Sequence, residues 1–244
     1  MFKQESPPPS VEPLKSELTS RRNFGLATAS VCTAAAAWCV SSGRNIQAAD
    51  QPMPESPQAA LKLLEEGNQR FAAGKSLATH RDIERVREVA PRQTPFAAFL
   101  GCADSRVPIE IVFDQGFGDL FVTRIAGNVA TSEVIGSLEF GTLILGAKVL
   151  YVLGHTDCGA VTATLKAEEV PGQISGLFQH IRPAVKAAKG DLRRSIEENV
   201  RNQAQLIAES SPVIRRLLRD KKLHVAGGVY DLVSGIVTPV RIEL

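Results

Sequence analysis

Three short apolar runs lie in the middle of the chain. They cover residues 96–100, 120–126 and 149–153, and they are followed by Gly101, Gly127 and Gly154. Each run has the length of a strand and carries apolar residues at successive positions rather than at alternate ones. This pattern is typical of parallel strands that are buried on both faces.

Helical patterns separate and follow these runs. Ser56-Pro57 precedes apolar residues at helical spacing and Gly74 follows them, which predicts a capped amphipathic helix. Further helices are expected over 82–89, over 132–145 with Ser132 as its cap, over 159–169, and two or three over 176–222 with breaks at Gly190 and Pro212. Residues 224–240 predict a hairpin with a turn near 234–235. The alternation predicts an α/β fold with a mostly parallel sheet of four to five strands flanked by helices.

Composition narrows the class of protein. Of the 244 residues, 44% are hydrophobic and 22% are charged, which suits one compact domain with a tail and excludes disorder throughout. Four Cys are too few for a small disulfide-stapled fold. The 28 Lys and Arg nearly balance the 26 Asp and Glu, so nothing in the charge favours a nucleic-acid partner.

The first fifty residues are typical of a targeting segment. Residues 1–20 are rich in Pro, Ser and Glu, Arg21-Arg22 and Phe24 follow, and an uncharged stretch then runs to Gly43. Paired arginines, a mildly apolar run and small residues near Ala49 resemble a twin-arginine export signal. We expect a disordered N-terminus with a signal segment at 1–49 and one domain at 50–244. The export machinery would then recognise the precursor and deliver it to the periplasm or another extracytoplasmic space. The alternative is a membrane tether formed by residues 23–43, although Ala and Thr outnumber Leu there.

Chemically active side chains follow two of the expected strands. The first group is Gly-Cys-Ala-Asp-Ser-Arg at 101–106, and the second is Gly-His-Thr-Asp-Cys-Gly at 154–159. Ligand sites of open α/β sheets lie beyond the carboxyl ends of the strands. In an extended segment, Cys102, Asp104 and Arg106 would project to one side. His155 and Cys158 are three residues apart where a strand turns into a helix, so both can face one point.

Two thiolates and one imidazole form a ligand set that suits zinc. Three protein ligands leave a fourth position for water, which is the mark of a catalytic zinc site, and Asp104 could also reach that position. A place near a helix N-terminus favours the thiolate of Cys158. The alternatives are two buried core cysteines or one disulfide. Asp157 suits a turn or a cap better than a further ligand.

The other three histidines lack a partner at ligand spacing. His80 and His180 lie in polar contexts and are expected to be solvated, while His224 begins the predicted hairpin. All three are left out of the metal site, and His80 is kept only as a candidate proton shuttle.

Four segments together resemble the β-class carbonic anhydrases. They are GCADSRVP at 101–108, RIAGN at 124–128, GSLEF at 136–140 and GHTDCGA at 154–160, and the similarity runs from about Ser56 to the C-terminus. The resemblance implies one zinc ion bound by Cys102, His155 and Cys158. It also implies a catalytic dyad of Asp104 and Arg106, and a homodimer or higher oligomer whose N-terminal helix packs on the partner.

The resemblance also assigns a pocket for carbon dioxide and bicarbonate. Gln93 matches a glutamine that donates to the substrate, and an apolar wall is matched by Phe121, Ala126 and Phe140. Ala126 replaces a common Val and Phe140 a common Tyr, so the pocket is expected to be roomier and to lack one hydroxyl.

The expected reaction is the reversible hydration of carbon dioxide to bicarbonate and a proton by zinc-bound hydroxide. A bidentate pair with Arg106 would keep Asp104 off the zinc, whereas in a closed state Asp104 would be the fourth ligand. Two alternatives remain open. One is hydrolysis of a related heterocumulene such as CS₂ or COS, and the other is a non-catalytic dimer that binds zinc or bicarbonate.

Overall fold

The five strands form one sheet at the centre of the domain. The computed structural model describes residues 53–244, so the predicted signal segment lies outside the described residues. The strands are β1 (Ala97–Gly101), β2 (Leu120–Arg124), β3 (Val149–His155), β4 (His224–Tyr230) and β5 (Val237–Pro239), arranged in the order β2-β1-β3-β4-β5. β1 to β4 pair in parallel and only β5 pairs antiparallel, with β4. The predicted fold class and the C-terminal hairpin are therefore confirmed.

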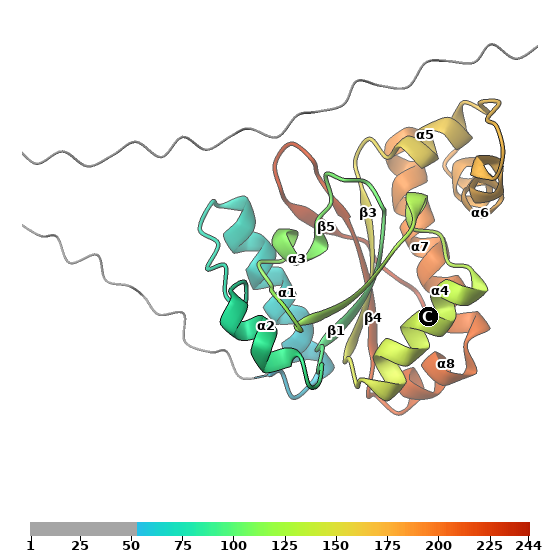
Figure 1. The fold of residues 1–244 in the computed structure, drawn as a ribbon. Coiled ribbons are helices and arrows are strands. Elements are labelled where there is room, and N and C mark those ends of the chain that lie inside the picture. The colour runs from blue at the N-terminus through green and yellow to red at the C-terminus, as the bar shows by residue number, and fades with distance from the viewer. Residues whose placement is uncertain (1–52) are drawn as a thin grey trace, which may run out of the picture. The chain divides into compact units, whose positions relative to one another are not determined.

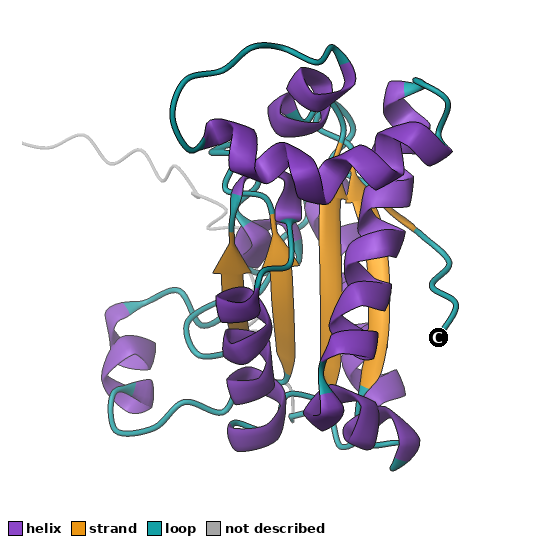
Figure 2. Ribbon diagram, turned by 90° about the vertical axis from the view of Figure 1, so that its right-hand side faces the viewer, coloured by secondary structure: helices purple, strands orange, loops and turns teal. Residues whose placement is uncertain are grey.

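Helices cover both faces of this sheet (Figure 1). On one face lie α1 (Pro57–Ala72) and α3 (Ile109–Val112), while α2 (Ile83–Val89) follows α1 in the chain. The other face carries α4 (Ser132–Glu139), α5 (Gly159–Leu165), α6 (Ile174–Ala187), α7 (Leu192–Ser210) and α8 (Pro212–Arg219), and Figure 2 looks onto this layer.

The sequence of β1 explains why both faces are covered. Ala97 and Phe99 belong to the core under α1 and α3, whereas Ala98 and Leu100 belong to the core under α4 to α8. Successive side chains of a strand point to opposite faces, so a strand that is apolar at every position must be covered twice.

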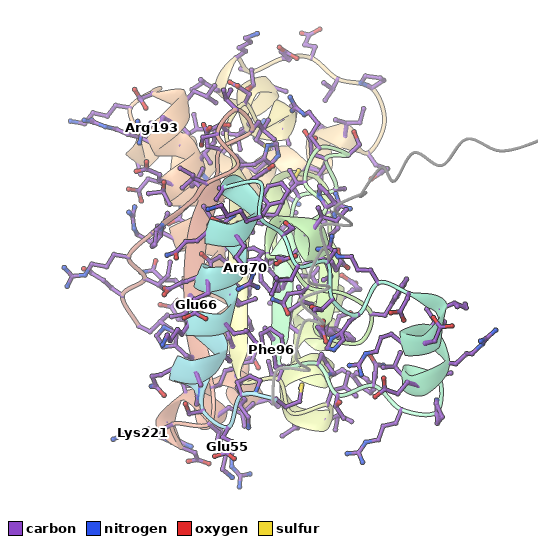
Figure 3. All side chains as sticks on the ribbon, turned by 90° about the vertical axis from the view of Figure 1, so that its left-hand side faces the viewer. Glu55, Glu66, Arg70, Phe96, Arg193 and Lys221 are labelled. Atoms are coloured by element: carbon purple, nitrogen blue, oxygen red, sulfur yellow. The ribbon has the colours of Figure 1, made fainter. Side chains whose placement is uncertain are left out.

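The first helix begins where the sequence predicts. Ser56 is its N-cap and accepts a hydrogen bond from the Ala59 N–H at 3.1 Å, and Pro57 is the first helical residue. Figure 3 looks onto this face and labels Glu66 and Arg70 on α1, with Phe96 just before β1. Arg70 Nε donates to Asp114 Oδ2 at 2.8 Å, which fixes the end of α1 to the loop after α3.

Several boundaries differ from the predicted ones. The helix expected at 132–145 has Thr131 rather than Ser132 as its N-cap, and its last turn is a π-helix over Phe140–Ile144. The helix expected at 159–169 ends at Leu165, because Ala167 adopts a left-handed φ of 50°. The strand expected at 120–126 ends at Arg124, since the Asn128 N–H bonds to the Ile125 carbonyl and closes a 3-10 turn.

Within residues 53–244, no helix combines the length and the apolar character that are needed to cross a membrane. The alternative of a tether at residues 23–43 falls on residues that the structure does not describe.

Candidate metal centre and catalytic dyad

Cys102, His155 and Cys158 form a compact buried group at the carboxyl edge of the sheet. Cys102 follows β1, His155 is the last residue of β3, and Cys158 is the N-cap of α5. β1 and β3 are neighbours with Gly101 opposite Leu153, so their ends meet. The two sulfurs and a ring nitrogen of His155 lie within 4.8 Å of one another. The three residues are 4%, 0% and 1% exposed, so bulk water does not compete for these atoms.

The imidazole of His155 presents a lone pair to this group. Its Nδ1 donates to the Thr156 carbonyl at 2.8 Å, which leaves Nε2 as the acceptor nitrogen. Among the described residues, His155 Nε2 is one of two buried side-chain nitrogens without a hydrogen-bond partner, the other being Asn128 Nδ2. A buried polar atom without a partner is costly, and a metal ion would satisfy it. The donor set therefore fits zinc.

The two sulfurs are free thiols rather than a disulfide. The pKa of the Cys102 thiol is lowered by a hydrogen bond from Cys158, with further help from His155 and from the Gly127 N–H, which lies 3.3 Å from the sulfur. The pKa of the Cys158 thiol is raised by the same pairing with Cys102 and by burial. A lowered thiol pKa favours the thiolate form, which is the form that binds a metal cation.

A tight turn separates the second and third members of the group. Thr156 and Asp157 form it, and Asp157 adopts a left-handed φ of 53° that an aspartate tolerates better than most residues. Thr156 Oγ1 accepts from the Leu232 N–H at 3.0 Å, so the turn is tied to the chain after β4. The predicted turn role of Asp157 is consistent with this geometry.

Asp104 and Arg106 form a forked ion pair beside the thiols. Arg106 Nε lies 2.9 Å from Asp104 Oδ1, and Arg106 Nη2 lies 2.7 Å from Oδ2. The guanidinium holds the pKa of the Asp104 carboxyl well below its usual range. Oδ2 lies 3.8 Å from His155 Nε2, so the carboxylate faces the candidate metal-binding group without a hydrogen bond to it.

The segment from Cys102 to Arg106 is not extended throughout, which corrects the prediction from spacing. β1 ends at Gly101, and Ser105 and Arg106 form a turn. The turn is closed by the Arg106 N–H, which donates to Asp104 Oδ1 at 2.9 Å. Arg106 therefore meets Asp104 by folding back rather than by sharing one side of a strand.

Arg124 is a residue to which the sequence analysis gave no role. It ends β2, donates from Nε to the Cys102 carbonyl at 2.9 Å, and donates from Nη2 to the Asp104 carbonyl. One guanidinium thus fixes the backbone on both sides of Ala103. It therefore also fixes how far Asp104 lies from Cys102. Its place at the end of an apolar strand, inside the RIAGN segment, was the available signal.

Comparisons with known proteins identify the family. The carbonic anhydrase family model matches residues 97–237. A carbonic anhydrase of Mycolicibacterium smegmatis is 39% identical over 201 residues, which cover 79% of this chain and 95% of the relative. The β-carbonic anhydrase CafA of Aspergillus fumigatus matches with a TM-score of 0.62 and 26% identity, over 77% of this chain and 91% of that one. This chain belongs to the β-class carbonic anhydrases. The predicted enzyme class is thereby confirmed.

The fold is shared beyond close sequence similarity. One chain from the crystal structures of two tetrameric β-carbonic anhydrases of Sordaria macrospora matches with a TM-score of 0.61 and 21% identity. The match covers 72% of this chain and 93% of that one.

The residues expected to line the substrate pocket do not gather in one chain of this β-carbonic anhydrase. Ala126 lies next to Gly127 and hence beside Cys102. Gln93 is exposed in the loop before β1, at the opposite end of that strand from Cys102. Phe121 is paired with Ala98 in the sheet, and its ring lies 6.2 Å from that of Phe140, which is 47% exposed.

The remaining histidines stay outside the candidate metal-binding group found among the described residues. His224 is exposed and His180 is partly buried. The expectation that His80 is solvated is wrong, because its side chain is only 21% exposed and its Nδ1 lies 2.7 and 2.9 Å from the two carboxylate oxygens of Asp119. Asp119 directly precedes β2, so His80 lies at the far end of the sheet from the thiols, and its role as a proton shuttle stays a prediction.

Proposed function

We propose that this protein catalyses the reversible hydration of carbon dioxide to bicarbonate and a proton, with one zinc ion held by Cys102, His155 and Cys158. The observation that carries the proposal is the buried group of two thiols and an unpartnered imidazole nitrogen, set beside a carboxylate that an arginine already holds. A group built only to bind zinc would have no need for the ionised Asp104 next to it.

When bound, zinc supplies a Lewis acid that lowers the pKa of a coordinated water towards ~7. Asp104 then acts through Oδ2, which accepts a hydrogen from the reacting oxygen and orients its remaining lone pairs towards carbon dioxide. Arg106 occupies both Asp104 oxygens, which keeps the carboxylate out of the ligand set. If the fork opened, Asp104 would be the natural fourth ligand of a closed site.

Carbon dioxide carries no charge, so its pocket must be apolar near the reacting atoms. Ala126 supplies part of that wall from the same chain. Gln93, Phe121 and Phe140 are expected to complete it, with the Gln93 amide donating to a product oxygen. The small side chain of Ala126 leaves room that a valine would fill.

Stopped-flow measurement of carbon dioxide hydration by the purified, zinc-loaded protein tests this function. We expect turnover that rises with pH from 6 to 9, a range chosen to bracket ~7. Parallel assays with COS and CS₂ separate the main function from heterocumulene hydrolysis. Absence of hydration with stoichiometric zinc bound would instead favour a non-catalytic zinc- or bicarbonate-binding dimer.

We also propose that the protein assembles as a homo-oligomer. β2 is an edge strand. Phe117, three residues before it, and Phe140, whose ring lies 6.2 Å from that of Phe121 in β2, are 49% and 47% exposed. An apolar surface of this kind favours a protein partner. A second copy placed there would also offer Gln93, Phe121 and Phe140 a route to a neighbouring metal centre.

Light scattering should therefore give a mass of at least twice the 26.2 kDa chain, or twice the processed chain. Phe117→Asp places a charge on this surface and should reduce the mass to that of one chain. Val233→Asp, at a position that is 93% exposed on the β4–β5 turn, serves as the control and should leave the mass unchanged. A single-chain mass for the unmodified protein would end this proposal.

For residues 1–49, we propose export by the twin-arginine route, with Arg21-Arg22 as the recognised pair. The exported, extracytoplasmic chain would then begin near residue 50. The mass of the protein recovered from cells distinguishes this from a retained tether at residues 23–43.

A further inference from the structure

Gly127 connects the sulfur of Cys102 to a distant helix. Its N–H donates to Cys102 Sγ at 3.3 Å, and its carbonyl accepts from Asn199 Nδ2 of α7 at 2.8 Å. Both contacts are buried, and Asn199 is 1% exposed. Gly127 is thus hydrogen-bonded to the Cys102 sulfur through its N–H and to the Asn199 amide through its carbonyl.

The surroundings of Gly127 leave it little freedom. Its φ of 74° lies in the left-handed region, where a side chain is strained. A Cβ at this position would lie 2.7 Å from Ile181 Cδ1 and 3.2 Å from Ala160 Cβ, so α6 and α5 close over the backbone. This packing prevents Gly127 from shifting. The hydrogen bonds of its N–H and of its carbonyl then fix the orientation of its backbone.

Asn199 is itself oriented by a second amide. Gln203, one turn further along α7, donates from Nε2 to Asn199 Oδ1 at 3.2 Å and to the His180 carbonyl at 3.1 Å. Gln203 Oε1 accepts from the Ala130 N–H at 2.8 Å. Because the Asn199 side-chain oxygen accepts from Gln203, the Asn199 amide nitrogen is directed at Gly127. Neighbouring core positions of α7 such as Val200 and Ala204 are apolar. A buried amide at residue 199 is costly unless it makes hydrogen bonds, so its role is to make these hydrogen bonds and not only to fill space.

We propose that Asn199 is a positioning residue of the metal centre, which holds Gly127 so that its N–H stays on the Cys102 sulfur. This inference rests on the proposed function, because it assumes that Cys102 is a zinc ligand. A hydrogen bond to a ligand sulfur withdraws electron density from it and fixes its direction, and partners of this kind tune both affinity and electronic structure.

Cobalt substitution tests the inference, because Co²⁺ reports its sulfur ligands through thiolate-to-metal charge-transfer absorption. Asn199→Ala and the similarly sized Asn199→Leu both remove the N–H donor. We expect the charge-transfer band to move to longer wavelength in both, since a sulfur without its hydrogen bond holds its lone pairs less tightly. Zinc affinity in a chelator competition should fall roughly 10- to 100-fold.

Asn68→Ala is the matched control. Asn68 is another buried amide, 6% exposed, and it donates to the carbonyls of Val112 and Gly235 on the α1 side of the sheet. Its loss should lower thermal stability and leave the band in place, which separates a general loss of packing from an effect on the sulfur.

The outcomes separate this inference from the proposed function. If the unmodified protein shows no cobalt–thiolate absorption, the metal centre itself is refuted. If the unmodified protein shows the band and both folded Asn199 variants keep its wavelength and the zinc affinity, the metal centre stands and the positioning role of Asn199 is overturned. Asn199→Leu preserves side-chain volume without a donor and so keeps the test decisive should Asn199→Ala fail to fold.

Discussion

Replacing Cys158 with serine should abolish stoichiometric zinc binding. The hydroxyl of serine does not ionise near neutral pH, so the site would lose one of its two thiolates and keep only Cys102 and His155 as strong ligands. The N-cap position of residue 158 in α5 favours an anion, which a neutral hydroxyl cannot exploit. We expect the affinity for zinc to fall by more than the roughly 10- to 100-fold that is typical of losing an outer hydrogen-bond partner.

Metal content after gel filtration, measured by elemental analysis, checks this prediction, and carbon dioxide hydration should fall with it. Val161→Ala is the matched control, because Val161 is 1% exposed in the same helix and offers no ligand atom. That variant should lose stability and keep its zinc. Stoichiometric zinc in Cys158→Ser would remove residue 158 from the ligand set.

The sequence was sufficient to predict those parts of the site that depend only on where a residue lies relative to the end of its own strand. β1 and β3 are apolar at consecutive positions, and a candidate ligand residue lies at or just after the carboxyl end of each. Parallel pairing of the two strands therefore brings Cys102 and His155 together. Cys158 is then placed by the turn that begins α5. Periodicity and the rule for strand ends placed both groups at the carboxyl edge of the sheet, and the strand order then made them neighbours.

Features that depend on packing between distant segments were not predictable. Arg124 reaches the carbonyls of Cys102 and Asp104 across 22 and 20 residues, and Asn199 reaches Gly127 across 72. The pairing of His80 with Asp119 is of the same kind, since the two are 39 residues apart. Neither periodicity nor residue type distinguishes these side chains from ordinary surface or helix residues, because their partners are set only when the helices close over the sheet.

The substrate residues show a different limit. Family resemblance named Gln93, Phe121, Ala126 and Phe140 as one pocket, whereas within one chain only Ala126 lies beside Cys102. A resemblance transfers residue types but carries no statement of which copy of the chain supplies each residue. If the protein assembles as proposed, the exposed surface around Phe140 would serve substrate binding as well as assembly.

Removing either member of the dyad should leave zinc in place and remove most of the hydration activity. Asp104→Ala deletes the acceptor that orients the reacting oxygen, and positioned acid–base groups contribute about 10²- to 10⁴-fold to rate. The ligand atoms of Cys102, His155 and Cys158 are untouched by this change, so metal content should remain stoichiometric.

Arg106→Ala tests a separate part of the argument. The pKa of Asp104 is depressed by Arg106, so removal of the guanidinium raises that pKa towards the ordinary value of about 3.9, and the carboxylate still stays ionised at pH 7. Loss of activity at neutral pH would therefore come from misplacement of Asp104, which is released to approach the ligand position, and not from its protonation. Arg106→Lys keeps the charge without the fork and should recover only part of the rate.

Stopped-flow hydration rates, combined with metal analysis of the same samples, measure both effects. Arg193→Ala is a suitable control, because the Arg193 side chain is 83% exposed and pairs with Glu197 on the surface of α7. It should retain full activity, since exposed ion pairs contribute little. Full activity in Asp104→Ala or in Arg106→Ala would refute the dyad, while loss of zinc from either variant would place that residue in the ligand set instead.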